Sequence, residues 1–183
     1  KIGEMEKDLG SREFLEGAKG YKWSPAETDT SIRPGWFYHK EEETSLKMLS
    51  KILDIYFRSV GNNGSMVLNI PPSHTGKIEK KDLDSLVTLG AQLKIEFKHN
   101  YALEGTFEAE KERDELHTAA MINEENGYWH SGESDKKTSI TLDLGKVQFI
   151  NKVVLGENEA TGQQIEKFNI LYFFDGKWRK IYS

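Results

Sequence analysis

The sequence predicts a chain of two parts: an α/β part, in which helices cover a parallel sheet, and an all-β part, in which antiparallel strands form a sandwich. Two observations predict this division. Strand and helix patterns alternate over residues 1–98, whereas short strands separated by turns follow over residues 99–183. Of the 183 residues, 37% are hydrophobic, so the chain can supply the cores of two small domains.

The first part contains two successive units of strand and helix. Ser11–Lys19 predicts a short helix, and Thr28–Ile32 predicts the first strand. Glu42–Val60 has apolar residues at the i, i+3, i+4, i+7 spacing of an amphipathic helix. Ser65–Ile70 is an apolar run suited to a strand buried on both faces, and Lys81–Phe97 predicts a second long helix. Two such units are too few to close a barrel, which needs about 250 residues.

The second part contains short strand candidates with no helix pattern between them. Thr138–Leu144 alternates apolar and polar residues, and Phe149–Leu155 and Phe168–Phe174 are further candidates. Asp175-Gly176 is a hairpin turn signal directly after the last of these. Short strands joined by turns are typical of an antiparallel sandwich.

Composition excludes several classes of function. The net charge is −5 and there is no basic stripe, which argues against a nucleic-acid partner. No run of 18 apolar residues is present, so no membrane span is expected. Cysteine is absent, so disulfides contribute nothing. No zinc or other catalytic metal is predicted, because the histidines lack ligand spacing: His39, His74, His99, His117 and His130.

Residues 23–97 resemble α-L-fucosidases of glycoside hydrolase family 29. The resemblance is strongest to the branch with plant and bacterial members that act on α-1,3/1,4-linked fucose. It is carried by four runs: Trp23–His39 (WSPAETDTSIRPGWFYH), Leu53–Tyr56 (LDIY), Ser59–Gly64 (SVGNNG) and Val67–Pro72 (VLNIPP). A chance match of that length is improbable.

Residues 99–183 resemble the galactose-binding-like sandwich of the coagulation-factor 5/8 C-terminal, or discoidin, type. The runs that carry this resemblance are Tyr128-Trp129, Ser139–Gly145, Val153–Glu157, Gly162–Phe168 and Asp175–Trp178. The family usually has Arg where this chain has Gln164. Such sandwiches are usually longer, so the last strands are expected to be missing.

Together the resemblances imply the last βα units of a (β/α)8-type barrel followed by a truncated sandwich of jelly-roll type. They also imply retaining hydrolysis by two carboxylates about 5–5.5 Å apart. In the family the nucleophile is an Asp on a middle barrel strand, and the acid/base is a Glu in a Gly-Asn-Glu motif. Glu4 follows Gly3 without the Asn. We therefore expect both catalytic carboxylates to precede residue 1 and the chain alone to be inactive, with the missing N-terminal part of its own barrel as its partner.

The candidate substrate-binding residues are Trp36, Arg33, Glu27 and Asp29. Arg33 and Trp36 fall at a strand end, where a barrel opens. Trp36 is suited to pack on the fucose ring or its methyl group, and Arg33 to hold a carboxylate or a sugar hydroxyl. The structural alternative is that Trp36 belongs to the core and that Arg33 pairs with Glu27 or Asp29. These two carboxylates share one strand face and suit a contact to the aglycone or an ion pair better than the catalytic dyad.

The expected ligand is a fucosylated oligosaccharide, and no cofactor is expected. Structural calcium is an option in the sandwich, although no motif supports it. The resemblance implies a secreted or periplasmic protein. Two alternatives stay open: a non-catalytic carbohydrate-binding or adhesion module, and a barrel glycosidase of other sugar specificity. Trp129 and Trp178 suit the sandwich core better than a sugar platform.

Overall fold

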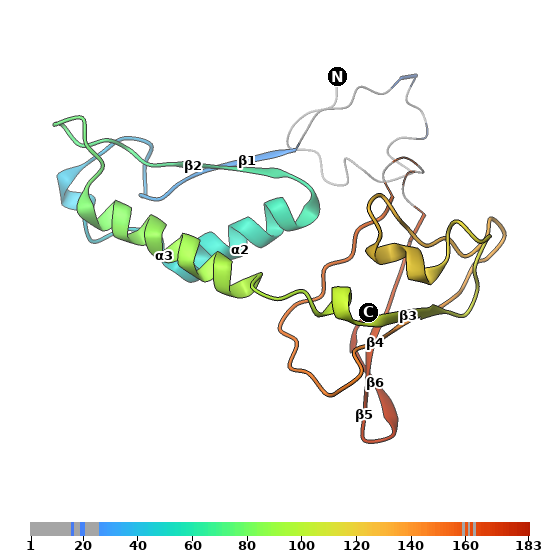
Figure 1. Ribbon diagram of the computed structural model, residues 1–183. Coiled ribbons are helices and arrows are strands. Elements are labelled where there is room, and N and C mark those ends of the chain that lie inside the picture. The colour runs from blue at the N-terminus through green and yellow to red at the C-terminus, as the bar shows by residue number, and fades with distance from the viewer. Residues whose placement is uncertain (1–15, 17–18, 21–25, 159, 161, 163) are drawn as a thin grey trace. The chain divides into compact units, whose positions relative to one another are not determined.

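The computed structural model describes residues 16, 19–20, 26–158, 160, 162 and 164–183 (Figure 1). The expected helix Ser11–Lys19 falls almost entirely outside these residues, and Trp23 lies outside them too. The chain divides into two compact units, residues 1–91 and residues 92–183. Within the described part, no helix has the length and apolar character needed to cross a membrane.

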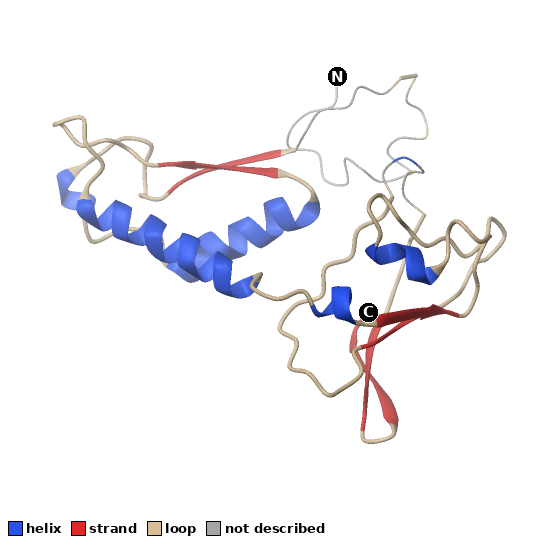
Figure 2. Ribbon diagram, viewed as in Figure 1, coloured by secondary structure: helices blue, strands red, loops and turns tan. Residues whose placement is uncertain are grey.

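Unit 1, residues 1–91, is built on a parallel pair of strands (Figure 2). β1, Glu27–Ser31, pairs with β2, Ser65–Asn69, so that the last residues of the two strands, Ser31 and Asn69, lie opposite each other. Both predicted strands are confirmed to within one residue at each end. Parallel strands need a long crossover connection, and the helix between them provides it.

That helix, α2, is Leu49–Ser59, with short 3-10 turns at Lys40–Glu42 and Val60–Asn62 on either side. The prediction that one helix begins at Glu42 is wrong, because the chain before Leu49 makes hydrogen bonds to the end of β1. The Lys47 amide donates to the Ile32 carbonyl at 2.9 Å, and the Lys47 ammonium donates to the Ser31 carbonyl. These bonds tie the segment to the end of β1 instead of to a helical turn.

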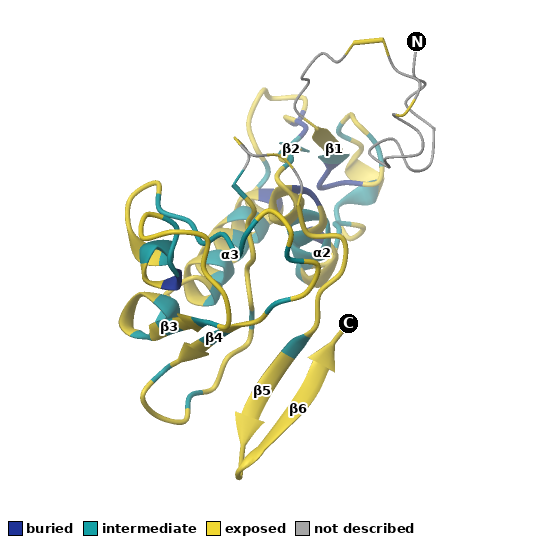
Figure 3. Cartoon of the chain, turned by 90° about the vertical axis from the view of Figure 1, so that its right-hand side faces the viewer, coloured by how far each residue is buried: buried dark blue, intermediate teal, exposed yellow. Residues whose placement is uncertain are grey.

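The small core of unit 1 lies between the end of β1 and α2 (Figure 3). Ile32 and Ile52 are almost fully buried, at 0% and 1% exposed. β2 was expected to be buried on both faces, but Val67 is 44% exposed, so one face of β2 is open. At the turn into β2, a Cβ on Gly64 would lie 3.1 Å from the Ser59 carbonyl oxygen, so a side chain here would be tightly packed against the backbone.

A buried ion pair joins the end of β1 to α3, Lys80–Glu96, which confirms the second predicted helix to within one residue. The Arg33 guanidinium donates from Nε and Nη2 to the two carboxylate oxygens of Asp82, at 2.9 and 3.0 Å. Both side chains are 0% exposed. The hydrogen bond to Asp82 is the main reason that the Arg33 pKa is raised. The pairing partner of Arg33 is therefore Asp82, and not Glu27 or Asp29.

Unit 2, residues 92–183, contains two separate antiparallel pairs. β3, Thr106–Ala109, pairs with β4, Ile140–Asp143, and β5, Ile170–Phe174, pairs with β6, Lys177–Tyr182. Short 3-10 turns occupy Tyr101–Glu104 and Ala119–Asn123.

The hairpin turn between β5 and β6 is confirmed, because Asp175 and Gly176 have positive φ angles of 52° and 72°. The prediction of a strand at Phe149–Leu155 is wrong: this segment forms no strand and pairs with none of the described strands, and Phe149 is 99% exposed. The sequence patterns did not reveal β3. Packing of the pairs into a sandwich stays a prediction.

Replacing Ile52 by Ala is expected to lower the free energy of unfolding of the 183-residue chain by about 2–5 kcal/mol, because a buried aliphatic side chain leaves a cavity. Urea denaturation followed by far-UV circular dichroism measures this. Lys51→Ala on the same helix is the control, since the Lys51 side chain is 59% exposed. Equal losses from the two variants would show that the Ile52 contact is not a core contact.

Replacing Asp82 by Ala is expected to lower the free energy of unfolding by about 3–5 kcal/mol, because it leaves the Arg33 charge buried and unpaired. Urea denaturation measures this loss. Asp84→Ala on the same helix breaks an exposed pair with Lys80 and is expected to cost less than about 1 kcal/mol. The double variant Arg33→Met/Asp82→Leu should regain much of the loss, since it removes both charges. A double variant as unstable as Asp82→Ala would contradict this account.

Candidate functional site

The candidate site lies at the carboxyl ends of β1 and β2. Parallel α/β folds place their ligands at these ends, in the loops that follow the strands. Because Ser31 and Asn69 end the two strands side by side, the loops that begin at Ile32 and Ile70 start next to each other. Trp36 lies in the first of these loops.

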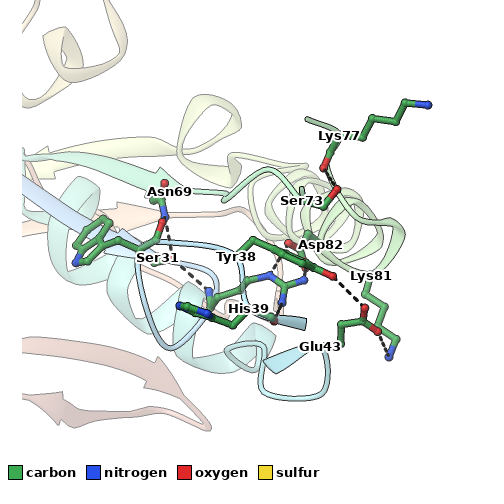
Figure 4. A network of polar contacts seen from close by, with 11 residues as sticks. Ser31, Tyr38, His39, Glu43, Asn69, Ser73, Lys77, Lys81 and Asp82 are labelled. Carbon is green, nitrogen blue, oxygen red and sulfur yellow. Dashed lines mark hydrogen bonds and ion pairs between the residues drawn. The ribbon is translucent and has the colours of Figure 1, made fainter. Parts of the chain in front are cut away.

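Side-chain hydrogen bonds fasten the backbone of the Trp36 loop, residues 33–39, including its middle and its far end (Figure 4). The side-chain amide of Asn69 donates to the Trp36 carbonyl at 3.0 Å and to the Ser31 hydroxyl at 3.1 Å. Nη1 of Arg33 donates to the His39 carbonyl at 3.4 Å. The backbone of the loop is thus held in its middle and at its far end.

Trp36 itself is 51% exposed. The next residue, Phe37, is 77% exposed. Trp36 is therefore not buried among the described residues of unit 1, and its place in the core of a complete barrel, the structural alternative, stays untested. An accessible aromatic face on a fixed backbone can pack against an apolar ligand surface, such as the C–H face of a sugar.

Tyr38 links this loop to the next one and to Arg33. Its ring stands edge-on to His74, with 5.5 Å between ring centroids, and the Arg33 guanidinium lies 4.8 Å from its centre. The Tyr38 hydroxyl donates to the Glu43 carboxylate at 3.2 Å. Burial and this hydrogen bond raise the pKa of Tyr38. Tyr38 is thus a neutral hydrogen-bond donor at ordinary pH.

Glu27 and Asp29 share one face of β1, and both are exposed. Glu27 begins the strand, so about 13 Å of extended backbone separates it from Ser31 at the carboxyl end. The structure does not bring Glu27 to the Trp36 loop. A substrate contact by Glu27, Asp29 or the buried Arg33 stays a prediction.

Two residues of this site were not found from the sequence. Asn69 stands in the run Val67–Pro72, and its position at a predicted strand end is a signal that could have found it. Asp82 lies in the first turn of a predicted helix, and only the fold brings it to Arg33. Among the described residues, no group of three or more His, Cys, Asp or Glu could hold a metal ion.

Unit 2 contains a cavity of about 520 Å³. Its walls come from two segments: Asn126, Gly127 and Tyr128 in one, and Gly156, Glu157, Asn158 and Ala160 in the other. Oε1 of Glu157 accepts the backbone amides of Gln164 and Ile165, each at 2.8 Å, so this carboxylate also orders the chain beside the cavity.

Of the two tryptophans of unit 2, Trp129 is half-buried, and a place in a sandwich core stays a prediction for both. Nε1 of Trp129 donates to the Lys111 carbonyl at 2.9 Å. Trp178 is 56% exposed on β6. Neither lines the cavity of unit 2.

The chain is similar to α-L-fucosidases along its length. The α-L-fucosidase family model matches residues 7–98, and the F5/8 type C domain model matches residues 104–183. "Alpha-L-fucosidase 1" of Arabidopsis thaliana is 30% identical over 191 aligned positions, which cover 100% of this chain and 37% of that protein. The chain spans about a third of the length of the curated relatives it matches.

Solved structures give the same result. The structure of SpGH29 superposes with a TM-score of 0.78 at 28% identity and covers 92% of this chain and 37% of that one. The Ruminococcus gnavus GH29 fucosidase E1_10125 in complex with fucose has a TM-score of 0.60 at 30% identity and covers 70% of this chain and 26% of that one. The chain therefore belongs to the α-L-fucosidase family, with an F5/8 type C domain after the fucosidase segment.

Proposed function

We propose that this chain is part of an exo-acting, retaining α-L-fucosidase that releases α-linked L-fucose from glycans. The observation that carries the proposal is the accessible indole of Trp36, held at the carboxyl end of a parallel strand within the segment that matches the fucosidase family. An aromatic face at this place suits a sugar-binding wall.

The proposed architecture is the end of a (β/α)8-type barrel followed by a β-sandwich. The order β1, α2, β2, α3 with parallel strands is the repeating unit of such a barrel. The open face of β2 at Val67 suits contact with further barrel residues. The partner of unit 1 is then the upstream part of its own barrel; "the full-length protein" below means the chain together with that part.

The chemistry of the reaction would come from two carboxylates, one attacking the anomeric carbon and one protonating the leaving oxygen. Neither family motif for these groups occurs in the sequence, so we place both upstream of Lys1. This chain would supply the pocket wall. Trp36 would pack on the fucose ring or its methyl group, and Arg33 would act through the loop that it holds.

The proposed substrate class is a fucosylated oligosaccharide. The Ruminococcus gnavus fucosidase was solved in complex with fucose, and its match to this chain supports the same sugar here. The second candidate is a carbohydrate-binding module, which the cavity of unit 2 favours because it combines an aromatic ring, a carboxylate and amides.

The purified 183-residue chain is expected to release no L-fucose from an α-1,3/1,4-fucosylated oligosaccharide, whereas the full-length protein is expected to release it. Chromatography of the free sugar measures both. Release by the 183-residue chain would overturn the upstream placement of the carboxylates. Glycan binding without release by the full-length protein would favour the binding module.

Replacing Trp36 by Ala in the full-length protein is expected to lower kcat/KM about tenfold or more, because the sugar loses an apolar contact worth about 1.5–3 kcal/mol. Trp36→Phe should retain most of the activity, since it keeps an aromatic face. Phe37→Ala, one residue further and more exposed, is the matched control. A loss from Phe37→Ala as large as that from Trp36→Ala would remove the special role of Trp36.

A further inference from the structure

Asn69 makes a contact that reaches from one strand end into the neighbouring loop. It is the last residue of β2, and its Nδ2 donates both to the Ser31 hydroxyl and to the Trp36 carbonyl. One amide nitrogen carries two N–H groups, so a single side chain can serve both acceptors. Its own backbone carbonyl accepts the Ile32 amide at 3.0 Å, which fixes Asn69 against the start of the same loop.

The Trp36 backbone needs such a contact because Trp36 is not buried in the core of unit 1. Trp36 is 51% exposed, so burial alone does not determine where its indole points. Arg33 holds the far end of the loop through His39, three residues beyond Trp36. Tyr38 holds the loop through its side chain, and the Asn69 amide bonds the backbone carbonyl of Trp36 itself.

We propose that Asn69 is a positioning residue for sugar recognition: its amide holds the Trp36 carbonyl so that the indole is already in place at the strand ends before the sugar arrives. This inference rests on the proposed function, in which Trp36 packs against fucose. An indole whose position is fixed before binding does not have to be ordered during binding. Loss of the Asn69 contact is therefore expected to weaken binding of the substrate.

Asn69→Asp is the first variant, because it keeps the shape of the side chain and removes the N–H groups that donate to Trp36 and Ser31. A carboxylate has no N–H, so the bond to the Trp36 carbonyl is lost and two oxygens face each other. The Ser31 hydroxyl can still donate to the carboxylate. Asn69→Ala removes both contacts without adding a charge, and it serves as the second variant if Asn69→Asp folds poorly.

Asn62→Asp is the matched control. The Asn62 amide also donates to a backbone carbonyl, that of Arg58, at 2.9 Å. This contact lies in the same unit, at the end of α2, and it does not involve the Trp36 loop. A general effect of losing an amide-to-carbonyl bond would appear in both variants.

The first experiment is fluorine NMR of the 183-residue chain labelled with 5-fluorotryptophan, with the Trp36 resonance assigned from Trp36→Phe. We expect Asn69→Asp and Asn69→Ala to shift and broaden this resonance and Asn62→Asp to leave it unchanged. An unmoved Trp36 resonance in both Asn69 variants overturns the inference.

The second experiment measures L-fucose release by the full-length protein. We expect Asn69→Asp to raise KM about fivefold and to leave kcat within about twofold. A change of this size corresponds to the loss of one hydrogen bond that supports substrate binding. Asn62→Asp should leave both constants unchanged. A rise in KM from Trp36→Ala with none from Asn69→Asp overturns the positioning role. Absence of release from the unaltered full-length protein overturns the proposed function and the sugar role together, while the NMR result still decides whether Asn69 holds Trp36.

Discussion

The buried pair between Arg33 and Asp82 is the interaction on which unit 1 depends. Burying two charges is costly, and the cost is offset only where geometry is good and the remaining donors are satisfied. Here the guanidinium meets both carboxylate oxygens and has a third acceptor in the His39 carbonyl. The Tyr38 ring covers its face. One side chain therefore fastens a strand end, a helix and a loop.

Two polar side chains, Arg33 and Asn69, hold the Trp36 loop at the strand ends. Arg33 is fully buried and fixes the loop to α3, whereas Asn69 is half-buried and fixes the middle of the loop to β2. The Trp36 indole between these anchors keeps its face accessible. Arg33 thus serves both the fold and the loop, whereas Asn69 contacts the middle of the loop, so a substitution at Asn69 is expected to act on Trp36 while the Arg33–Asp82 pair stays in place.

Local patterns predicted the elements whose formation depends on neighbours in sequence. β1, β2 and α3 were placed to within one residue, and the turn at Asp175-Gly176 was found because only tolerant residues adopt its positive φ angles. The α2 start was misplaced because Lys47 bonds to the end of β1, a contact that a helical period does not reveal.

Elements and pairs that depend on distant residues could not be read from local patterns. Phe149–Leu155 has strand-like residues and no strand partner, so it has no ladder to join. The partner of Arg33 lies on a helix after β2, while nearer carboxylates made a more obvious choice. Trp36 could be predicted as a site residue because strand ends are where such folds bind ligands, but its anchor Asn69 follows only from the pairing of β1 with β2.

The β5–β6 hairpin of unit 2 differs from the Arg33 pair, because the hairpin is held by contacts between residues close in sequence. An isolated two-stranded hairpin is marginal in water, so cross-strand pairs must contribute. Phe173 meets Trp178 with 5.3 Å between ring centroids, and the Arg179 guanidinium lies 5.8 Å from the centre of the Phe174 ring. These contacts span only a few residues of the hairpin. A substitution at Arg33 acts on a strand, a helix and the loop that carries Trp36, and therefore on the proposed site.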